Sequence, residues 1–171
     1  MSVEELPLNF ELFLLLQKLR HPALDELFRY LSLLGSGWAV LPLAVWTYFY
    51  RRRKLLPLLT ALLLETLAVT ALKSLIHAPR PPVYFPELEP LFNLRWRSFP
   101  SGDAAMAFTV ACVMAEGESR KVKLLWCLYA LTVAFGRVYA GVHFPLDVAA
   151  GALLGVTIGK LTIYLYNKRG R

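Results

Sequence analysis

The chain has 171 residues, 57% of them are hydrophobic, and its mean hydropathy is +0.48. One domain of this size cannot bury so much apolar surface inside itself, so the composition excludes an ordinary water-soluble protein and predicts an integral membrane protein. The net charge of +7 would suit nucleic acid, but the basic residues fall in short clusters between apolar segments. We therefore expect the bilayer, and no nucleic acid, as a partner.

The first apolar segment covers residues 8–19 and is too short to cross the membrane. A crossing of about 30 Å of hydrocarbon takes about 20 helical residues. The segment also carries Glu11, Gln17 and Lys18 among its leucines and phenylalanines. This pattern favours an interfacial helix within residues 1–22, with a sixth, tilted span as the alternative.

Five longer apolar segments follow, and they predict an all-α, integral-membrane helical bundle over residues 23–171. They cover residues 27–50, 55–76, 101–115, 122–140 and 144–166. The third segment is short and begins directly after Pro100, which favours a helix that starts inside the outer boundary of the membrane. On the last segment, Gly151, Gly155 and Gly159 have the spacing that lets helices approach closely. We expect one membrane-embedded domain over residues 1–171.

The basic residues predict the orientation of the bundle. They cluster at residues 51–54, 120–123 and 168–171, and five crossings put all three clusters on the same side. By the positive-inside tendency that side is the cytoplasm. The loops at residues 77–100 and 141–143 then face outward.

Several polar residues lie at the outer ends of the predicted spans, where a charged side chain is costly without a partner or a task. They are Lys73, Arg80, Ser101, Gly102, Arg137, His143 and Asp147. Arginine and lysine bind phosphate oxygens, and a helix N-terminus adds free backbone amides. Each residue alone is better explained by head-group contact or packing. The whole set predicts a phosphate pocket.

Three strings in this set resemble the signature of the type 2 phosphatidic acid phosphatases, membrane lipid phosphatases related in fold to the vanadium haloperoxidases. The strings are Lys73-x6-Arg80-Pro81, Pro100-Ser101-Gly102-Asp103 and Arg137-x5-His143-x3-Asp147. They occur in the order of the family. Two positions differ, because Asp103 stands where the family has histidine and Gly136 stands where it usually has serine.

The resemblance implies a metal-independent hydrolase that needs no cofactor. His143 would attack phosphorus and form a phosphohistidine, Asp147 would orient its ring, and residue 103 would protonate the leaving group. The remaining residues would hold the phosphate oxygens, namely Lys73, Arg80, Ser101, Gly102 and Arg137.

Asp103 leaves three interpretations open. The reference pKa of an aspartic acid is about 3.9, so proton donation at pH 7 needs an upward shift of about 3 units. Asp103 is therefore an acid of raised pKa, or the substrate has a leaving group that needs less protonation, such as a second phosphate or an anomeric oxygen, or the change disables turnover.

The resemblance also implies a multi-pass protein of the bacterial inner (cytoplasmic) membrane, with its active site facing the periplasm. Its phospholipid or lipid-phosphate substrate would be lipid A 1-phosphate, undecaprenyl pyrophosphate, phosphatidylglycerophosphate or phosphatidic acid. Arg95, Trp96 and Arg97 favour a large anionic head group such as lipid A, with a membrane anchor as the alternative. The rival functions are a catalytically impaired lipid-phosphate-binding relative and a small anion transporter. Against the transporter, the charges lie at one rim and no inverted repeat is visible.

Overall fold

The computed structural model describes residues 6–94 and 96–169 as helices joined by short loops and one long loop. The elements are α1 (Pro7–Gln17), α2 (Pro22–Leu31), the 3-10 helix η2 (Ser32–Gly35), α3 (Gly37–Tyr50), α4 (Arg52–Leu75), α5 (Pro81–Tyr84), α6 (Gly102–Ala115), α7 (Arg120–Tyr139) and α8 (Pro145–Arg169). This part of the chain contains no strand, which confirms the all-α prediction.

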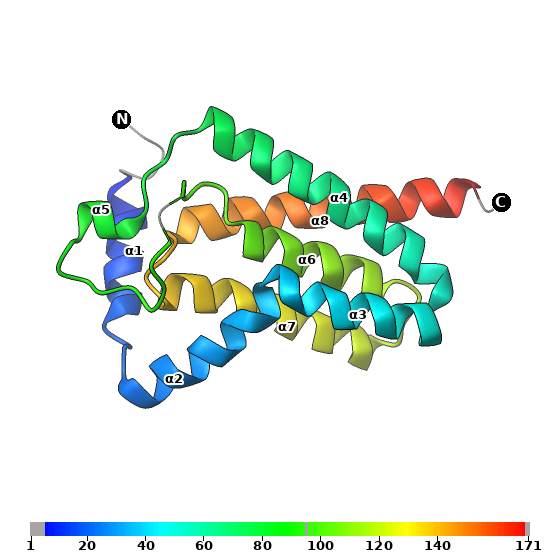
Figure 1. Ribbon diagram of the computed structural model, residues 1–171, viewed down its shortest axis with the longest axis horizontal. Coiled ribbons are helices and arrows are strands. Elements are labelled where there is room, and N and C mark those ends of the chain that lie inside the picture. The colour runs from blue at the N-terminus through cyan, green and yellow to red at the C-terminus, as the bar shows by residue number, and fades with distance from the viewer. Residues whose placement is uncertain (1–5, 95, 170–171) are drawn as a thin grey trace.

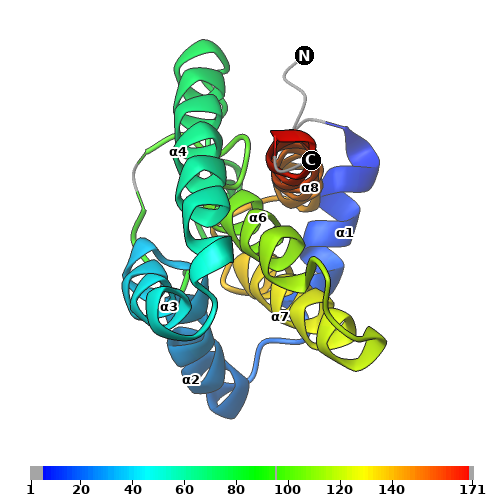
Figure 2. The ribbon, with the colours of Figure 1, turned by 90° about the vertical axis from the view of Figure 1, so that its right-hand side faces the viewer.

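Helix α6 lies at the centre of the bundle and packs against α4, α7 and α8 (Figure 2). Its approach to α8 is close, because a Cβ atom at Gly155 would collide with the carbonyl oxygen of Ala105. Small residues permit such backbone contact between membrane helices. The glycines of α8 therefore have the packing role that their spacing predicts.

The outer surface of the bundle is suited to lipid. Helices α4, α7 and α8 are each long and apolar enough to cross a membrane. The helices α2 and α3 pass the same test together as one bent pair, and α6 is a shorter apolar helix. Leucines point outward, with Leu56 exposed by 62% and Leu153 by 70%. Because this surface would be costly in water, the protein is a multi-pass membrane protein.

The apolar segment predicted over residues 27–50 is bent within its first half and is not one straight helix. The segments Pro22–Gly35 and Gly37–Tyr50 meet at an angle of 55°. Ser36 is extended between them, and its Oγ donates to the carbonyl oxygen of Leu33 at 2.6 Å. A Cβ atom at Gly35 would stand 2.6 Å from Cγ1 of Val133 and 3.3 Å from Cβ of Asp103. Gly35 thus lets the bend approach α7 and the start of α6.

Helix α1 lies across one end of the bundle, at a steep angle to the long helices (Figure 1). Two of its polar residues and Phe13 point inward: Asn9 and Gln17 are buried, and Gln17 Nε2 donates to the carbonyl oxygen of Val138 at 2.8 Å. Several of its leucines point outward, with Leu8 exposed by 65% and Leu15 by 58%, and Glu11 is exposed as well. Eleven residues give a helix of about 17 Å, too short for a sixth span. The exposed leucines fit the interfacial prediction.

The two ends of the bundle differ in chemistry. The α3–α4 and α6–α7 junctions and the C-terminal end of α8 lie together, and the long loop after α4 lies at the opposite end with α5 and the α7–α8 loop (Figure 1). The described members of the three basic clusters therefore share one end. There Lys54 Nζ donates to Glu118 Oε1 at 2.9 Å and joins two of the junctions.

Candidate active site

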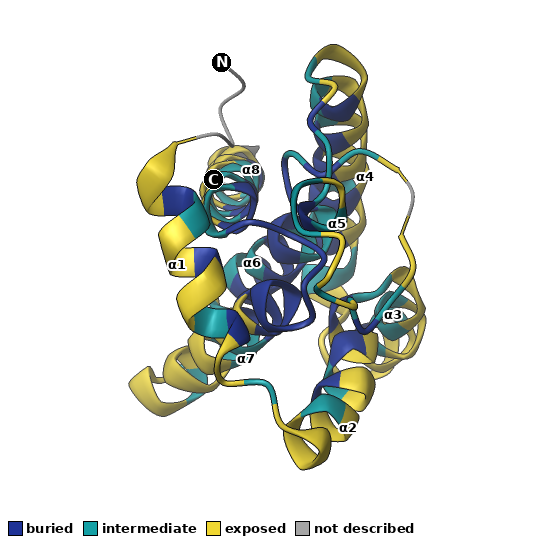
Figure 3. Cartoon of the chain, turned by 90° about the vertical axis from the view of Figure 1, so that its left-hand side faces the viewer, coloured by how far each residue is buried: buried dark blue, intermediate teal, exposed yellow. Residues whose placement is uncertain are grey.

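A cavity of about 350 Å³ opens at the loop end of the bundle. Six of the eight predicted site residues line it, namely Lys73, Arg80, Gly102, Asp103, Arg137 and His143. The other two, Ser101 and Asp147, lie behind its wall and are fully buried. Figure 3 shows that the buried part of the chain gathers at the centre of this end. Residues far apart in the sequence thus meet in one pocket, which we call the catalytic cavity.

His143, in the loop between α7 and α8, presents one ring nitrogen to the cavity and the other to the protein. Its Nε2 lies 3.3 Å from Arg80 Nη1, and its Nδ1 lies 3.3 Å from Asp147 Oδ2. A guanidinium group only donates, so Nε2 accepts and Nδ1 carries the proton. This tautomer leaves the lone pair of Nε2 on the cavity side.

Asp147, in the first turn of α8, holds this arrangement from behind. Its Oδ2 accepts the backbone amide of Phe144 at 2.8 Å and the hydroxyl of Ser98 at 2.5 Å. Ser98 Oγ is also 3.2 Å from His143 Nδ1, and the Ser98 side chain is fully buried. The three side chains of Ser98, His143 and Asp147 therefore form one hydrogen-bonded group.

Ser98 was missed in the sequence because it lies in the long loop, three residues before Ser101, and carries no charge that would mark it at a membrane boundary. The only available signal was its place just before the Pro100-Ser101-Gly102 string.

Backbone carbonyl groups of the loops hold the side chains of Lys73 and Arg80 in place. Lys73 Nζ, at the end of α4, donates to the carbonyl oxygens of Arg97 at 2.7 Å and Ser98 at 2.9 Å. Arg80, just before α5, donates to the carbonyl oxygens of Trp96, Arg97 and Val142. Because these carbonyls accept several of the donors of Arg80, its guanidinium is held against His143.

The start of α6 brings backbone amides to the same place. Ser101 is the N-cap, and its Oγ accepts the amide of Ala104 at 3.4 Å. The amide of Ser101 donates to the carbonyl oxygen of Asp147 at 2.9 Å, which ties the start of α6 to the start of α8. Gly102, the first residue of α6, lines the cavity at the positive end of the helix dipole.

Asp103 and Arg137 form an ion pair across the catalytic cavity. Arg137 Nε lies 2.9 Å from Asp103 Oδ2, without the geometry of a hydrogen bond. The guanidinium of Arg137 also stacks over Phe92, with 5.6 Å between its central carbon and the ring centroid. The carboxylate that replaces the family histidine thus neutralises one of the three cations.

Burial controls the charge of the two loop residues in the site. It lowers the pKa of His143 to about 3, against the opposing effect of the Asp147 carboxylate. It also lowers the pKa of Arg80 to about 10, assisted by the nearby charge of Arg137. At pH 7, His143 is therefore a neutral imidazole and Arg80 is still a cation.

Trp96 and Arg97 lie beside this site. Arg97 Nη1 donates to the carbonyl oxygen of Lys73 at 2.6 Å, and Trp96 is exposed by 56%. Arg95 lies outside the described residues. In the described part of the chain, no three His, Cys, Asp or Glu side chains are placed to hold a metal ion.

Known proteins share both the sequence and the fold. The chain is 45% identical to Aquifex aeolicus LpxE, whose crystal structure it matches with a TM-score of 0.93 over 96% of this chain and 99% of that one. It is 31% identical to an undecaprenyl-diphosphatase of Sulfolobus acidocaldarius over 92% of this chain and 78% of the relative. It is 28% identical to a lipid A 4'-phosphatase of Porphyromonas gingivalis over 91% and 72% of the two chains. The model of the PAP2 superfamily matches residues 54–171, and the chain belongs to this superfamily of membrane lipid phosphatases.

Proposed function

We propose that this protein hydrolyses the phosphate of a lipid head group through a phosphohistidine intermediate on His143. The observation that carries the proposal is the orientation of His143: its Nε2 faces a cavity lined by three cations, while Asp147 and Ser98 hold its Nδ1. A neutral imidazole whose unprotonated nitrogen faces the phosphate is a nucleophile, and a carboxylate on the opposite nitrogen stabilises the charge that develops on attack.

The reaction divides into two displacements at phosphorus. In the first, a bond forms between Nε2 of His143 and phosphorus, and the bond from phosphorus to the lipid oxygen breaks with its electron pair on that oxygen. In the second, water attacks phosphorus, the bond to Nε2 breaks, and inorganic phosphate leaves. Lys73, Arg80 and Arg137 stabilise the oxygens of the transferred group, together with the amides at the start of α6. This chemistry needs no metal ion, because the three cations supply the positive charge.

The ion pair with Arg137 stabilises the ionised form of Asp103, which is a poor proton donor, whereas burial favours the protonated form. We propose that the ion pair prevails, and of the interpretations of Asp103 we therefore choose the leaving group that needs little protonation. An anomeric oxygen, as in the 1-phosphate of lipid A, and a diphosphate, as in undecaprenyl pyrophosphate, both meet this condition. Phosphatidylglycerophosphate and phosphatidic acid release an ordinary alkoxide and meet it less well. The diphosphate substrate named for one of the relatives supports the same choice.

The membrane position follows from the two ends of the bundle. The basic clusters lie at the end opposite the catalytic cavity, and basic loops mark the cytoplasmic side of a membrane protein. We propose a site at the head-group level of the outer leaflet of a bacterial inner membrane, open to the periplasm.

The test is phosphate release from detergent-solubilised lipids, with lipid A and undecaprenyl pyrophosphate as substrates and dioctanoyl phosphatidic acid as the comparison. Release is expected to survive a chelator and to stop in His143→Ala. Brief incubation with substrate labelled in the phosphate should leave an acid-labile, alkali-stable label on the wild type. Release that persists in His143→Ala would exclude this nucleophile, and release that the chelator removes would exclude a metal-free reaction.

The ion pair also favours a second candidate function, a catalytically impaired protein that binds lipid phosphates. Asp103 replaces the proton donor of the family and occupies Arg137, so both acid catalysis and phosphate binding are weakened in principle. This candidate predicts binding of the labelled lipids without release of phosphate. The release assay therefore separates the two functions.

A further inference from the structure

Helix α1 packs against the ends of α7 and α8, and so against the loop between them that carries His143. We call residues 140–144 the catalytic loop, and all five of them are buried. The superfamily model begins at residue 54, so α1 lies outside the part of the chain that defines the family. Its contacts with the catalytic loop therefore belong to none of the phosphatase motifs.

Gln17, at the end of α1, holds the start of the catalytic loop. Its Nε2 donates to the carbonyl oxygen of Val138 at 2.8 Å, and the same oxygen accepts the amide of Gly141 at 2.9 Å. Gly141 has a φ of +72°, and a Cβ atom there would stand 3.5 Å from Oε1 of Gln17. The buried side chain of Gln17 thus lies against the turn that leads from α7 to His143.

Asn9, two turns earlier on α1, holds the other end of the catalytic loop. Its Oδ1 accepts the amide of Leu146 at 3.0 Å, and its side chain is buried. Leu146 lies in the first turn of α8, where backbone amides have no partner within the helix. It directly precedes Asp147, so Asn9 fixes the backbone beside the carboxylate that orients His143.

Two phenylalanines of α1 fill the space behind the catalytic loop. Phe144, the neighbour of His143, is fully buried, and its ring centroid lies 5.1 Å from that of Phe13 and 5.2 Å from that of Phe10. The loop is therefore held by two hydrogen bonds and an aromatic cluster, all from one helix.

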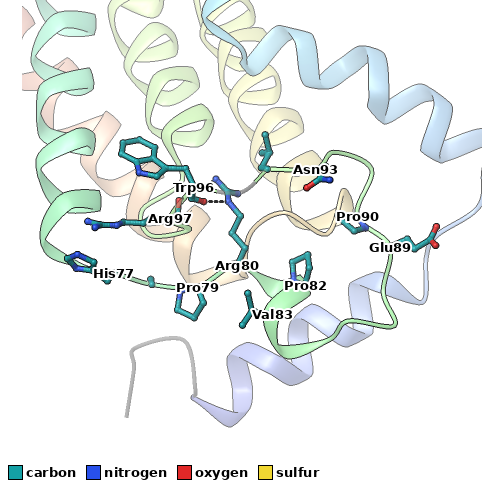
Figure 4. Close-up of a pocket in the computed structure, with 12 residues that line it drawn as sticks. His77, Pro79, Arg80, Pro82, Val83, Glu89, Pro90, Asn93, Trp96 and Arg97 are labelled. Carbon is teal, nitrogen blue, oxygen red and sulfur yellow. Dashed lines mark hydrogen bonds between the residues drawn. The ribbon is translucent and has the colours of Figure 1, made fainter.

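The same cluster contacts α5, the short helix that follows Arg80. The ring centroid of Phe10 lies 5.2 Å from that of Tyr84 and 5.3 Å from that of Phe85. Figure 4 shows Arg80 just before α5, where its side chain lines a cavity of about 750 Å³ and donates to the carbonyl oxygen of Trp96. Helix α1 thus supports the segment of the cation that contacts His143 as well as His143 itself.

We infer that α1 is a positioning element of the active site, and that Asn9 and Gln17 are positioning residues for His143. Neither side chain lines the catalytic cavity, so neither touches the substrate. Loss of their hydrogen bonds leaves the phosphate-binding cations in place and lets the imidazole move relative to phosphorus, where a displacement of about 1 Å can cost about 100-fold in rate. The inference rests on the proposed function, because it takes His143 as the nucleophile.

The experiment removes each hydrogen bond of α1 with little change in side-chain size, by Asn9→Leu and Gln17→Met. Thr109→Val is the matched control, because the fully buried Thr109 donates to the carbonyl oxygen of Gly155 at 3.2 Å between α6 and α8. Leu15→Ala is the control on α1 itself, because Leu15 is exposed by 58%.

The measurements are Tm and the initial rate of phosphate release in detergent. The substrate is whichever of lipid A, undecaprenyl pyrophosphate and dioctanoyl phosphatidic acid the wild type hydrolyses fastest, over a range of concentrations.

Asn9→Leu and Gln17→Met are each expected to lower kcat about tenfold, while KM stays within about twofold of the wild type. Asn9→Asp keeps an oxygen that accepts the amide at the start of α8, so it should restore kcat to within about threefold of the wild type. Thr109→Val and Leu15→Ala should keep kcat within about twofold, although Thr109→Val lowers Tm.

Wild-type kcat in both Asn9→Leu and Gln17→Met, a rise of KM with kcat unchanged, or the same loss of kcat in Thr109→Val would overturn the positioning role and leave the phosphatase intact. If one of the two α1 variants does not fold, the other decides, and failure of both to fold would also overturn the inference, because α1 would then be required for the fold. A wild type that releases no more phosphate than His143→Ala would overturn the proposed function and the inference together.

Discussion

A single substitution of Ser98 tests whether its hydroxyl group positions the imidazole of His143. It donates to Asp147 Oδ2 at 2.5 Å and lies 3.2 Å from His143 Nδ1, in a fully buried position. Ser98→Ala removes a hydrogen bond to a charged group, which contributes about 1.5–3 kcal/mol. If this contribution is expressed in the transition state, where the imidazole gains charge, kcat falls about 10- to 100-fold.

The structure also predicts which kinetic constant changes. Lys73 contacts the backbone carbonyl group of Ser98, which alanine retains, so the phosphate-binding cations stay in place. We therefore expect KM to remain within about twofold of the wild type while kcat falls. The assay is initial-rate phosphate release over a range of lipid concentrations, and Ser98→Thr should restore part of kcat because it keeps the hydroxyl.

Ser36→Ala is the matched control, because Ser36 lines the catalytic cavity and donates to the carbonyl oxygen of Leu33, away from His143. It should leave kcat within about threefold of the wild type. Wild-type kcat in Ser98→Ala, or a rise of KM with kcat unchanged, would refute the assignment of Ser98 as a positioning residue for the imidazole.

Three further predictions concern proton binding, the leaving group and packing. The pKa of His143 is about 3 in the folded protein and about 6.5 when unfolded, so the unfolded state binds more protons and stability falls as pH drops below about 6.5. By pH 5 this group lowers the free energy of unfolding by about 2 kcal/mol. The drop in Tm between pH 7.5 and pH 5 should therefore be smaller in His143→Gln than in the wild type. An equal drop would contradict the buried neutral imidazole. Asp103→His should raise kcat on phosphatidic acid by about 100-fold and change kcat on lipid A far less, because only the alkoxide needs an acid. A loss on both lipids would instead assign an essential role to the Asp103 carboxylate. Gly151→Ala should lower kcat about 100-fold, because the added Cβ displaces Ser101. Gly159→Ala places its Cβ against Cys112, so it should lower Tm and leave kcat unchanged. Equal kcat in the two variants would rule out a link between the packing of Gly151 and the site.

The fold was predicted well where one sequence signal decides the local structure. Pro100 followed by a helix-capping serine marked the start of α6, and Ser101 is its N-cap. The bend between α2 and α3 was missed because apolar residues continue on both sides of it. Gly35 breaks the segment by its tertiary contact with Val133 on α7, and hydropathy contains no information on that contact.

In the candidate site, too, the sequence predicted the features with a local signal and missed those that depend on tertiary contacts. Charged residues at a membrane boundary stand out, so the motifs named the cations, His143 and Asp147, and the structure brings them together. Ser98 gave no such signal, because an uncharged serine in an outer loop is unremarkable. The pairing of Asp103 with Arg137 was also invisible, although both residues were named, because it depends on the distance between α6 and α7.

Packing and chemistry are coupled at Gly151. A Cβ atom there would collide with the carbonyl oxygen of Ser101 and stand 3.3 Å from Cβ of Ala104. The amide of Ser101 in turn donates to the carbonyl oxygen of Asp147 at 2.9 Å. The close approach of α6 and α8 therefore sets the distance between the phosphate-binding amides at the start of α6 and the carboxylate that orients His143. Because a shift of about 1 Å can cost about 100-fold in rate, we expect this glycine to affect the reaction in addition to the packing that its spacing predicts.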